Sequence, residues 1–570
     1  GAPTPAALGF ARSKGVSVEA LEVREVDGGR YVTAVVREAG RPAPIVLAEL
    51  LPALIGRLQF DKTMRWNASG VAFSRPIRWL VGLLGDHVIP FAFAGVTSGR
   101  ATRGLRPQGS PPIVIDRADD YLARLRRAHI EADPERRRAA ILKQVRRLAR
   151  EVGGQVADEG VLDEVTNLVE EPTALLGAFD EAHLALPREV LVSVMKKHQR
   201  YFPVEPSGPA GSRLLPYFIA VRNGDRRHLD LVRAGNEHVV RARFADAAFF
   251  VREDVKHPLA DFLPRLATLT FQKKLGSMLD KAQRIEQLTG ALAPSLGLDP
   301  AETATALRAA HLAKADLATQ MVVEMTSLQG VMGAEYARRS GEPADVAQAI
   351  REQYQPAGAG EALPASRPGL AVGLADRLDS LVGLFAAGLA PTGSADPFGL
   401  RRAALGVTQI LTGRALNLDL RPVLSQALDR QPAAVQPAAE ARAGLLGEVL
   451  TFITGRLRGQ LLEAGYRYDV VEAVLAEQAH NPYQVLLGVQ QLSAWGQRAD
   501  WSPILAAYAR CVRITRDQAT DYPLQPERLA EPAETALYQA YLEAAPRPIA
   551  SVDDFFAALL PMIPAISRFF

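Results

Sequence analysis

The feature that most constrains this 570-residue chain is a change in hydrophobic periodicity near residue 230. Before this point, runs with the two-residue spacing of strands alternate with helical runs. After it, apolar residues recur almost only at the three- and four-residue spacing of amphipathic helices. The helical segments of this second part include 232–254, 271–290, 303–325 and 368–388. The chain is therefore predicted to be multidomain and predominantly α, with mixed α/β modules in its first half.

The first half has local signals that fix some of its elements. Asp27-Gly28-Gly29 and Gly85-Asp86 each separate two strand-like runs and predict hairpins. Asp133 and Pro134 predict the start of a long helix that ends at Gly153-Gly154. Its apolar stripe is expected at Ala140, Ile141, Val145 and Leu148. Its many basic residues are interpreted either as a solvated face or as a phosphate-facing surface.

Composition excludes several classes of protein. The chain has 66 Lys and Arg against 63 Asp and Glu, so a net charge of +3 does not by itself indicate a nucleic-acid partner. The single cysteine, Cys511, cannot form a disulfide within one chain, which fits a reducing, cytoplasmic location. No apolar run reaches the roughly 18 residues of a membrane span, so no membrane partner is expected. The first residues also lack the pattern of a secretory signal.

Motifs of known chemistry are missing from the sequence. There is no phosphate-binding GxxxxGK[ST] loop, no GxGxxG after a strand, no GxSxG elbow and no HExxH pattern. The acidic run at 376–379 is interpreted most simply as a solvated helix face. No catalytic residue, metal ligand or bound cofactor is predicted for this chain, and binding is the expected activity.

Two segments, 309–317 and 373–381, resemble helices of the HD phosphohydrolase superfamily, whose metal site uses a His, a His-Asp pair and a distant Asp. On this chain those positions fall near Asp280-Lys281, on Ala313-Lys314 and on Asp376. Only Asp376 matches, and a lysine brings positive charge where a metal needs an anionic ligand. The resemblance thus implies an HD-like domain with a degenerate metal site. A metal-dependent phosphohydrolase and a helical scaffold are the alternatives.

Longer blocks then resemble one family closely, the beta chain of bacterial tetrameric glycyl-tRNA synthetase. They include MRWNASGVAFSRPIRWLVGLL (64–84), FAGVTSGRATRGLR (93–106), LPREVLVSVMKKHQRYFPV (186–204), FIAVRNGD (218–225), LVRAGNEHVVRARFADAAFFVRED (231–254), FQKKLGSMLDKAQRI (271–285) and PTGSADPFGLRRAALGV (391–407). The blocks cover nearly the whole chain in the family's order. Relative to that family, further N-terminal and C-terminal segments are expected.

The resemblance implies three regions. Residues 1–255 would form mixed α/β modules, 256–395 the HD-like helical domain, and 396–570 a linker with a DALR-type anticodon-binding helical bundle. It also implies a tRNA-binding beta subunit, needed for ATP-dependent attachment of glycine to tRNA(Gly). The adenylate-forming site, with ATP and Mg, would lie on an alpha chain. The expected partners are that alpha subunit and tRNA(Gly), with no DNA.

Three groups of residues are predicted to bind tRNA. One late helix would present charge beside an aromatic ring, through Arg510, Arg513, Arg516 and Tyr508. The start of the HD-like domain and its degenerate metal site would present lysines to phosphate, namely Lys273, Lys274 and Lys314. The opening of a later helix would present an arginine pair, Arg401 and Arg402.

The arginine pair has two interpretations. Asp396 as N-cap and Pro397 at the first position predict a helix start after a turn at Gly393 and Ser394. Cations near that end are unfavourable to the helix dipole. The pair would either hold a carboxylate, Asp396 or Asp379, or face tRNA phosphate. Since adjacent helical residues point about 100° apart, one role is expected for each arginine.

Overall fold

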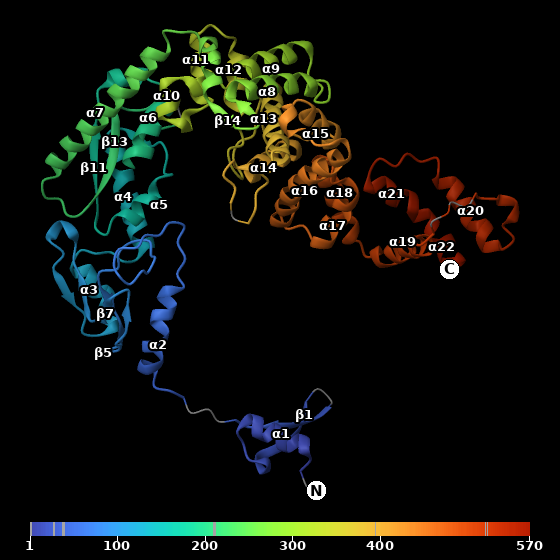
Figure 1. The fold of residues 1–570 in the computed structure, drawn as a ribbon, viewed down its shortest axis with the longest axis horizontal. Helices are drawn as coiled ribbons and strands as arrows, with labels where there is room; N and C mark the ends of the chain where they lie inside the picture. The colour runs from blue at the N-terminus through green and yellow to red at the C-terminus, as the bar shows by residue number, and fades with distance from the viewer. Residues whose placement is uncertain are drawn as a thin grey trace. The chain divides into compact units, whose positions relative to one another are not determined.

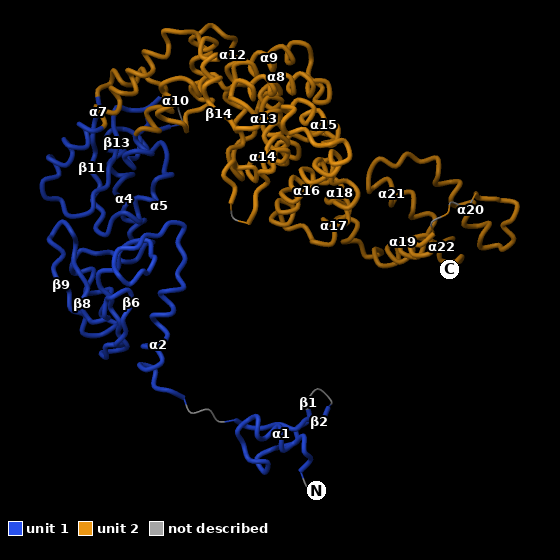
Figure 2. The backbone as a smooth tube through the Cα atoms, in the orientation of Figure 1, with its two compact units in different colours: residues 1–179, 195–239 blue, residues 180–194, 240–570 orange. Residues whose placement is uncertain are grey.

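The computed structural model describes residues 3–26, 29–36, 40–208, 213–393, 395–518, 520 and 523–570. The chain forms two compact units, which Figure 2 colours separately. Unit 1 comprises Gly1–Phe179 and Met195–Val239, and unit 2 comprises Asp180–Val194 and Val240–Phe570. The later division falls inside helix α7 (Leu229–Asp254), close to the change in periodicity. The predicted boundaries at 255 and 395 remain predictions.

Unit 1 is mixed α/β, and unit 2 is almost entirely helical, as Figure 1 shows. This confirms a predominantly α, multidomain fold with its mixed part in the first half. The helices within unit 1 are α1 (Pro5–Lys14), α2 (Ala43–Gly56), α3 (Tyr121–Arg127), α4 (Pro134–Glu151) and α5 (Leu162–Leu168). Its strands are β1 (Leu21–Val26), β2 (Gly29–Ala34), β3 (Leu80–Val81), β4 (Leu83–Leu84), β5 (His87–Val88), β6 (Ala92–Phe93), β7 (Val96–Gly99), β8 (Ala101–Arg103), β9 (Pro112–Val114), β10 (Gly154–Val156), β11 (Pro172–Ala178), β12 (Phe202–Pro206) and β13 (Tyr217–Asn223).

Both predicted hairpins form. Strands β1 and β2 pair antiparallel from Leu21 with Ala34 to Val26 with Gly29, and Asp27 and Gly28 of the predicted turn lie outside the described residues. Strands β4 and β5 pair across the turn at Gly85 and Asp86. Gly85 has φ +59°, a left-handed conformation that costs glycine little, which is why this position suits the turn.

Helix α4 covers an antiparallel sheet of order β10-β12-β13-β11. The helix begins as predicted, because the Asp133 carboxylate accepts hydrogen bonds from the backbone N–H groups of Glu135 and Arg136. Of its predicted apolar stripe, Ile141, Val145 and Leu148 pack against the sheet in one core, whereas Ala140 is only partly buried and does not belong to that core. That core includes Ile141, Val145, Leu148, Phe202, Val204 and Ile219. Gly154, predicted as part of the helix end, instead opens β10.

Unit 2 is built around α13 (Arg367–Ala386), which packs against α8, α9, α12, α14 and α15. Most of its side chains are buried all round the helix, as expected for a central helix. The other elements within unit 2 are α6 (Arg188–Ser193), β14 (Thr270–Gln272), β15 (Gly276–Ser277), α8 (Met278–Leu292), α9 (Pro300–Leu312), α10 (Gln320–Glu324), α11 (Val331–Arg339), α12 (Ala344–Glu352), α14 (Leu400–Gly413), α15 (Leu420–Asp429), α16 (Ala439–Glu463), α17 (Tyr468–Gln478), α18 (Pro482–Gly496), α19 (Trp501–Thr515), α20 (Pro532–Ala544), α21 (Val552–Leu559) and α22 (Ile563–Phe569).

None of the described helices combines the length and apolar character that crossing a bilayer requires.

Candidate functional site

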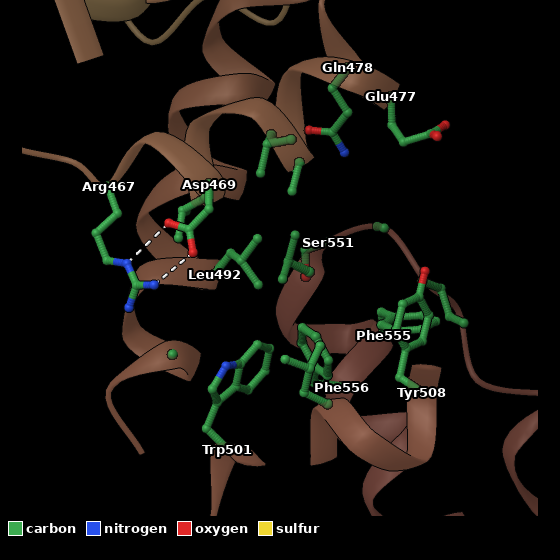
Figure 3. Close-up of a pocket in the computed structure, with 18 residues that line it drawn as sticks. Arg467, Asp469, Glu477, Gln478, Leu492, Trp501, Tyr508, Ser551, Phe555 and Phe556 are labelled. Atoms are coloured by element: carbon green, nitrogen blue, oxygen red, sulfur yellow. Dashed lines mark hydrogen bonds and ion pairs between the residues drawn. The ribbon is translucent and has the colours of Figure 1, made fainter. Parts of the chain in front are cut away.

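A pocket of about 610 Å³ opens among helices α17, α18, α19 and α21 (Figure 3). All four helices contribute lining residues, and the segment just before α21 adds three more. The lining residues are Arg467, Asp469, Val470, Ala473, Val474, Glu477, Gln478, Leu492, Gly496, Trp501, Leu505, Tyr508, Ile549, Ala550, Ser551, Val552, Phe555 and Phe556. The lining combines aromatic rings with a few polar side chains, the usual composition of a small-molecule or base pocket.

Aromatic side chains form one wall of this pocket. The rings of Trp501 and Phe556 meet edge to face with centroids 5.3 Å apart, and those of Tyr508 and Phe555 do so at 5.8 Å. Phe556 is buried, whereas Tyr508 is 40% exposed. Edge-to-face packing is a favourable geometry for aromatic pairs. It therefore fixes Tyr508 while leaving part of its ring open to a ligand.

Polar groups complete the lining. Arg467 donates to the two carboxylate oxygens of Asp469 at 3.0 and 2.6 Å, and these bonds hold the pKa of Asp469 below its usual range. Figure 3 shows this pair and, elsewhere on the rim, Glu477 and Gln478. The buried Oε1 of Gln478 has no hydrogen-bond partner within the described part of the chain. A carboxylate, a guanidinium and an amide can together recognise the edge of a nucleobase.

Of the predicted late-helix residues, the structure brings only Tyr508 to the pocket. Arg510 and Arg513 are exposed on α19, and Arg516 is exposed at its C-terminal cap; none of the three lines the pocket. Arg513 lies in the last turn, where a cation suits the helix dipole. Their contact with tRNA remains a prediction.

The sequence reasoning missed most of the pocket. Trp501, Phe555 and Phe556 were not predicted, since they come from two helices that meet only in the folded chain. One signal was available: Ser551 followed three residues later by Asp554 marks a helix start, and two phenylalanines follow at once. In the structure the Ser551 hydroxyl accepts from the Asp554 N–H, which confirms that start.

Lys273 and Lys274 lie in the turn between β14 and β15, and both are exposed. The turn is held by Gln272, whose side-chain oxygen accepts from the Lys274 backbone N–H at 2.6 Å. The Lys274 ammonium is 3.4 Å from the carbonyl oxygen of Ala387. Lys273 therefore presents its charge to solvent, and the predicted phosphate contact of this turn stays a prediction.

The predicted contact of Lys314 with RNA phosphate is wrong, because this side chain is only 3% exposed and faces a carboxylate. Its ammonium lies 2.7 Å from Oδ2 of Asp376 and 4.1 Å from the centre of the Tyr354 ring. Lys281, on α8, lies 2.9 Å from the other oxygen of Asp376. Burial alone raises the pKa of Asp376, but the two ammonium groups outweigh it and hold that pKa well below its usual range. The lysines thus neutralise a carboxylate instead of reaching RNA.

The acidic run at 376–379 was also interpreted wrongly as a solvated face. Asp379 is 1% exposed, and its carboxylate accepts from Lys281 at 3.0 Å and from Arg284 at 2.7 Å. Lys281 and Arg284 are three residues apart on α8, and Asp376 and Asp379 have the same spacing on α13. Matched spacing on two packed helices places each cation opposite an anion. We call Lys281, Arg284, Lys314, Asp376 and Asp379 the buried charge cluster.

The same unit buries a further carboxyl group, that of Asp316. Its Oδ2 accepts from the backbone N–H groups of Gly330 at 2.6 Å and Gly333 at 3.1 Å. Its Oδ1 has no partner among the residues that the structure describes. Burial raises the pKa of Asp316 to about 6, against which these two hydrogen bonds and the charge of Lys314 act.

Asp316→Asn is expected to remove a pH dependence of stability. Between about pH 4 and pH 6 the folded chain holds a proton on Asp316 that the unfolded chain has lost, so stability falls as pH rises through this range. A shift of about two pKa units corresponds to about 3 kcal/mol. The neutral amide keeps the oxygen that accepts from Gly330 and Gly333. Between pH 4.5 and 7.5, the unfolding temperature of the parent should fall as pH rises, and that of the variant should fall less. Parallel curves of unfolding temperature against pH would contradict the assignment.

The helix bearing Arg401 and Arg402 starts three residues later than predicted. Helix α14 begins at Leu400 after Gly399 in a left-handed conformation, and the Asp396 carboxylate accepts from the backbone N–H groups of Leu400 and Arg401 at 2.9 Å each. Gly399 is therefore the N-cap, and the prediction of Asp396 at that position is wrong, although its carboxylate still accepts from two N–H groups of the first turn across the intervening residues. Ser394 lies outside the described residues.

The structure corrects part of the prediction for the partners of Arg401 and Arg402. The Arg401 guanidinium donates to the carbonyl oxygen of Gly393 at 2.5 Å, so it closes the turn before its own helix. Asp379 belongs to the buried charge cluster, and its predicted pairing with Arg401 is wrong. Arg402 is exposed, and its predicted contact with tRNA remains a prediction.

Comparisons with known proteins agree on one family. The family model of the glycyl-tRNA synthetase beta subunit matches residues 1–476. The glycine–tRNA ligase beta subunit of Moorella thermoacetica is 44% identical over 566 residues, which cover 99% of this chain and 81% of that protein. Those of Desulforudis audaxviator and Myxococcus xanthus are 44% and 42% identical, over 100% of this chain and 83% and 82% of theirs.

Proposed function

Because the chain belongs to the glycyl-tRNA synthetase beta-subunit family, we propose that its C-terminal pocket binds an unpaired base of tRNA(Gly). The chain functions as part of a glycine–tRNA ligase, and the beta-subunit name of its relatives implies a complex with an alpha subunit. In this proposal the alpha subunit forms glycyl-adenylate from glycine, ATP and Mg²⁺ in the cytoplasm. The beta chain itself binds no cofactor and selects the tRNA.

The observation that carries the proposal is the partly exposed ring of Tyr508 in a pocket that also offers hydrogen-bonding groups. Bases in RNA loops are unstacked, so proteins read them by stacking on aromatic rings and by hydrogen bonds to their edges. Asp469 and Gln478 supply acceptors and donors within the same pocket. Exposed Arg510, Arg513 and Arg516 lie on the same helix as Tyr508 or at its end, where they would hold the phosphates. We assign this helical bundle to the DALR-type anticodon-binding class.

We assign the core of unit 2 to an HD-like fold with a degenerate metal site. The resemblance places the metal ligands of an HD enzyme near Lys281, at Lys314 and at Asp376. In the structure the ammonium groups of Lys281 and Lys314 lie 2.9 and 2.7 Å from the two carboxylate oxygens of Asp376. Two ammonium groups therefore lie where the carboxylate would hold a cation. This arrangement supports a structural role over phosphohydrolase activity, the rival hypothesis.

Tyr508→Ala is expected to lower kcat/KM for charging of full-length tRNA(Gly) about tenfold or more, measured with the alpha subunit present. Loss of one base–aromatic stack costs about 1–3 kcal/mol. An acceptor-stem minihelix has no anticodon loop, so its charging should stay unchanged. Arg513→Ala should also weaken only the full-length reaction, with a weaker dependence on salt.

Tyr508→Phe is the matched control, because it keeps the ring that packs against Phe555. It should retain most of the charging activity. Unfolding temperatures of the variants separate a local loss of binding from damage to the bundle. If Tyr508→Ala lowers charging of tRNA and minihelix equally, the pocket does not read the anticodon loop.

A further inference from the structure

Unit 1 contains a second pocket, of about 1050 Å³, that the preceding assignment does not use. One wall carries the arginines Arg78, Arg103 and Arg106 together with Trp79. The lining also includes Glu131, Asn167, Glu170 and Asn223. Positive charge, a large aromatic ring, amides and carboxylates therefore line the same pocket. We call it the arginine pocket.

The three arginines of this wall are placed by local strand structure. Arg103 is the last residue of β8, next to Thr102, which is only 6% exposed, so the two side chains point to opposite faces of the strand. Arg106 opens a short 3-10 helix (Arg106–Gln108), and Arg78 lies two residues before the start of β3. All three are exposed, and no carboxylate of the described residues lies within 4.0 Å of their guanidinium groups. Their charge is thus available to an anion.

Trp79 lines the same pocket as these arginines and is 43% exposed. Its indole N–H donates to the Thr102 hydroxyl at 3.2 Å, which fixes the ring beside β8. A tryptophan that is held by a hydrogen bond and still open to solvent is a stacking surface for a base or a guanidinium. Because these three arginines line the same pocket, a base with its own phosphate fits better than a further cation.

A small buried core holds the arginine pocket in shape before a ligand binds. Leu105, between Arg103 and Arg106, is fully buried with Leu125 and Ile130 in a small core, which fixes the turn that carries the two arginines. A fourth lining arginine, Arg137, donates to the carbonyl oxygens of Thr166 at 2.7 Å and Glu131 at 2.6 Å, so it serves the structure. A rigid pocket loses little entropy when a ligand binds.

The polar lining residues favour one orientation of the ligand. The amide oxygen of Asn223 accepts from the backbone N–H groups of Glu170 at 3.0 Å and Glu171 at 2.9 Å, which leaves its amide nitrogen as the donor for a ligand. The carboxylates of Glu131 and Glu170 repel phosphate but accept hydrogen bonds from base amino groups. Phosphates therefore belong beside the arginines, and base edges beside the Asn223 amide and the two carboxylates.

We propose that the arginine pocket binds an unpaired segment of RNA, with one base stacked on Trp79 and successive phosphodiesters along Arg78, Arg103 and Arg106. Each phosphodiester carries one negative charge, so three unneutralised arginines match a short run of phosphates better than a single nucleotide. The segment must be unpaired, because a base in a duplex cannot reach the ring. The site is distinct from the C-terminal pocket, and it rests on the proposed function only in taking RNA as the polyanion.

The test measures binding of a labelled five-nucleotide RNA by fluorescence anisotropy to the full chain carrying Tyr508→Ala, which disables the C-terminal pocket. In this background, Arg103→Gln with Arg106→Gln should weaken binding about tenfold or more and lower the slope of log affinity against log salt by about one to two. Trp79→Ala should weaken binding with the slope unchanged, and Trp79→Phe should retain it. Arg117→Gln, an exposed arginine that pairs with Asp119 at 3.8 Å, is the control and should change nothing.

Three results would overturn the proposal. Unchanged affinity in the double arginine variant would show that the wall does not bind RNA, and equal binding of a duplex of the same length would show that no base reaches Trp79. Displacement of the RNA by AMP at equal concentration would assign the pocket to a free nucleotide. Because binding is read directly in the Tyr508→Ala background, failure here leaves the charging experiment on the C-terminal pocket unaffected, and the converse also holds.

Discussion

Lys281→Ala is expected to destabilise unit 2 by about 3–5 kcal/mol, since removing one partner of a buried ion pair leaves an uncompensated charge. Lys281 is 4% exposed and lies 2.9 Å from Asp376 and 3.0 Å from Asp379. It also donates to the Ser380 hydroxyl at 2.8 Å. The substitution therefore removes a charge from two carboxylates at once. The measurement is amide hydrogen exchange of peptides from α8 and α13, which reports the free energy of local opening.

Lys256→Ala is the matched control for this prediction. Lys256 pairs with Glu253 at 2.5 Å, but its side chain is 56% exposed, and such a surface pair contributes about 0–1 kcal/mol. High salt should screen the control pair and leave the effect of Lys281→Ala nearly unchanged. Burial alone raises the pKa of Asp379, but pairing with Lys281 and Arg284 outweighs it and lowers that pKa. The stabilisation should therefore be present at neutral pH and be lost as pH falls below the ordinary carboxyl range. A loss no greater than that of the control would show that the cluster is not a stabilising unit.

Asp254→Ala is expected to destabilise unit 2 by about 3 kcal/mol or more, because it leaves three donors without an acceptor at about 1–3 kcal/mol each. Asp254, at the end of α7, is 2% exposed. Its carboxylate accepts from the backbone N–H groups of Gln320 at 2.9 Å and Met321 at 3.0 Å, and from the Tyr336 hydroxyl at 2.8 Å. It therefore caps α10 from another part of the chain.

Tyr336→Phe separates the parts of this effect, since it removes one donor and keeps the ring. Its loss should be about 1 kcal/mol, the net contribution of a single hydrogen bond. Urea unfolding of the two variants under the same conditions gives the comparison. Equal losses for Asp254→Ala and Tyr336→Phe would mean that the bonds to α10 add nothing.

Local interactions explain which elements could be predicted from the sequence. The start of α4 follows from Asp133 and Pro134 alone, because a cap involves only the next three residues. The start of α14 was predicted three residues early, since the left-handed Gly399 inserts a turn that Asp396 spans. Helical spacing predicted the central helix, but it did not reveal that the helix is buried on all sides.

The sites depended on contacts that spacing does not reveal. Lys314 was predicted to face phosphate, and its partner Asp376 lies 62 residues further along the chain. The Tyr508 ring was predicted to bind tRNA, but its pocket is completed by Phe555 and Phe556 from another helix. The arginine pocket likewise joins residues before β3, at the end of β8 and near α4. Residue type thus indicated the chemistry, while tertiary packing decided where it could act.

Lys281 and Lys314 give the core of unit 2 cations that are covalent parts of the chain. A carboxylate neutralised by a bound ion depends on the supply of that ion, and a chelator can strip it away. Asp376 has no such dependence, because its counter-charges cannot diffuse out or be exchanged for another metal. The integrity of this core should therefore be indifferent to EDTA and to the divalent-ion content of the cell.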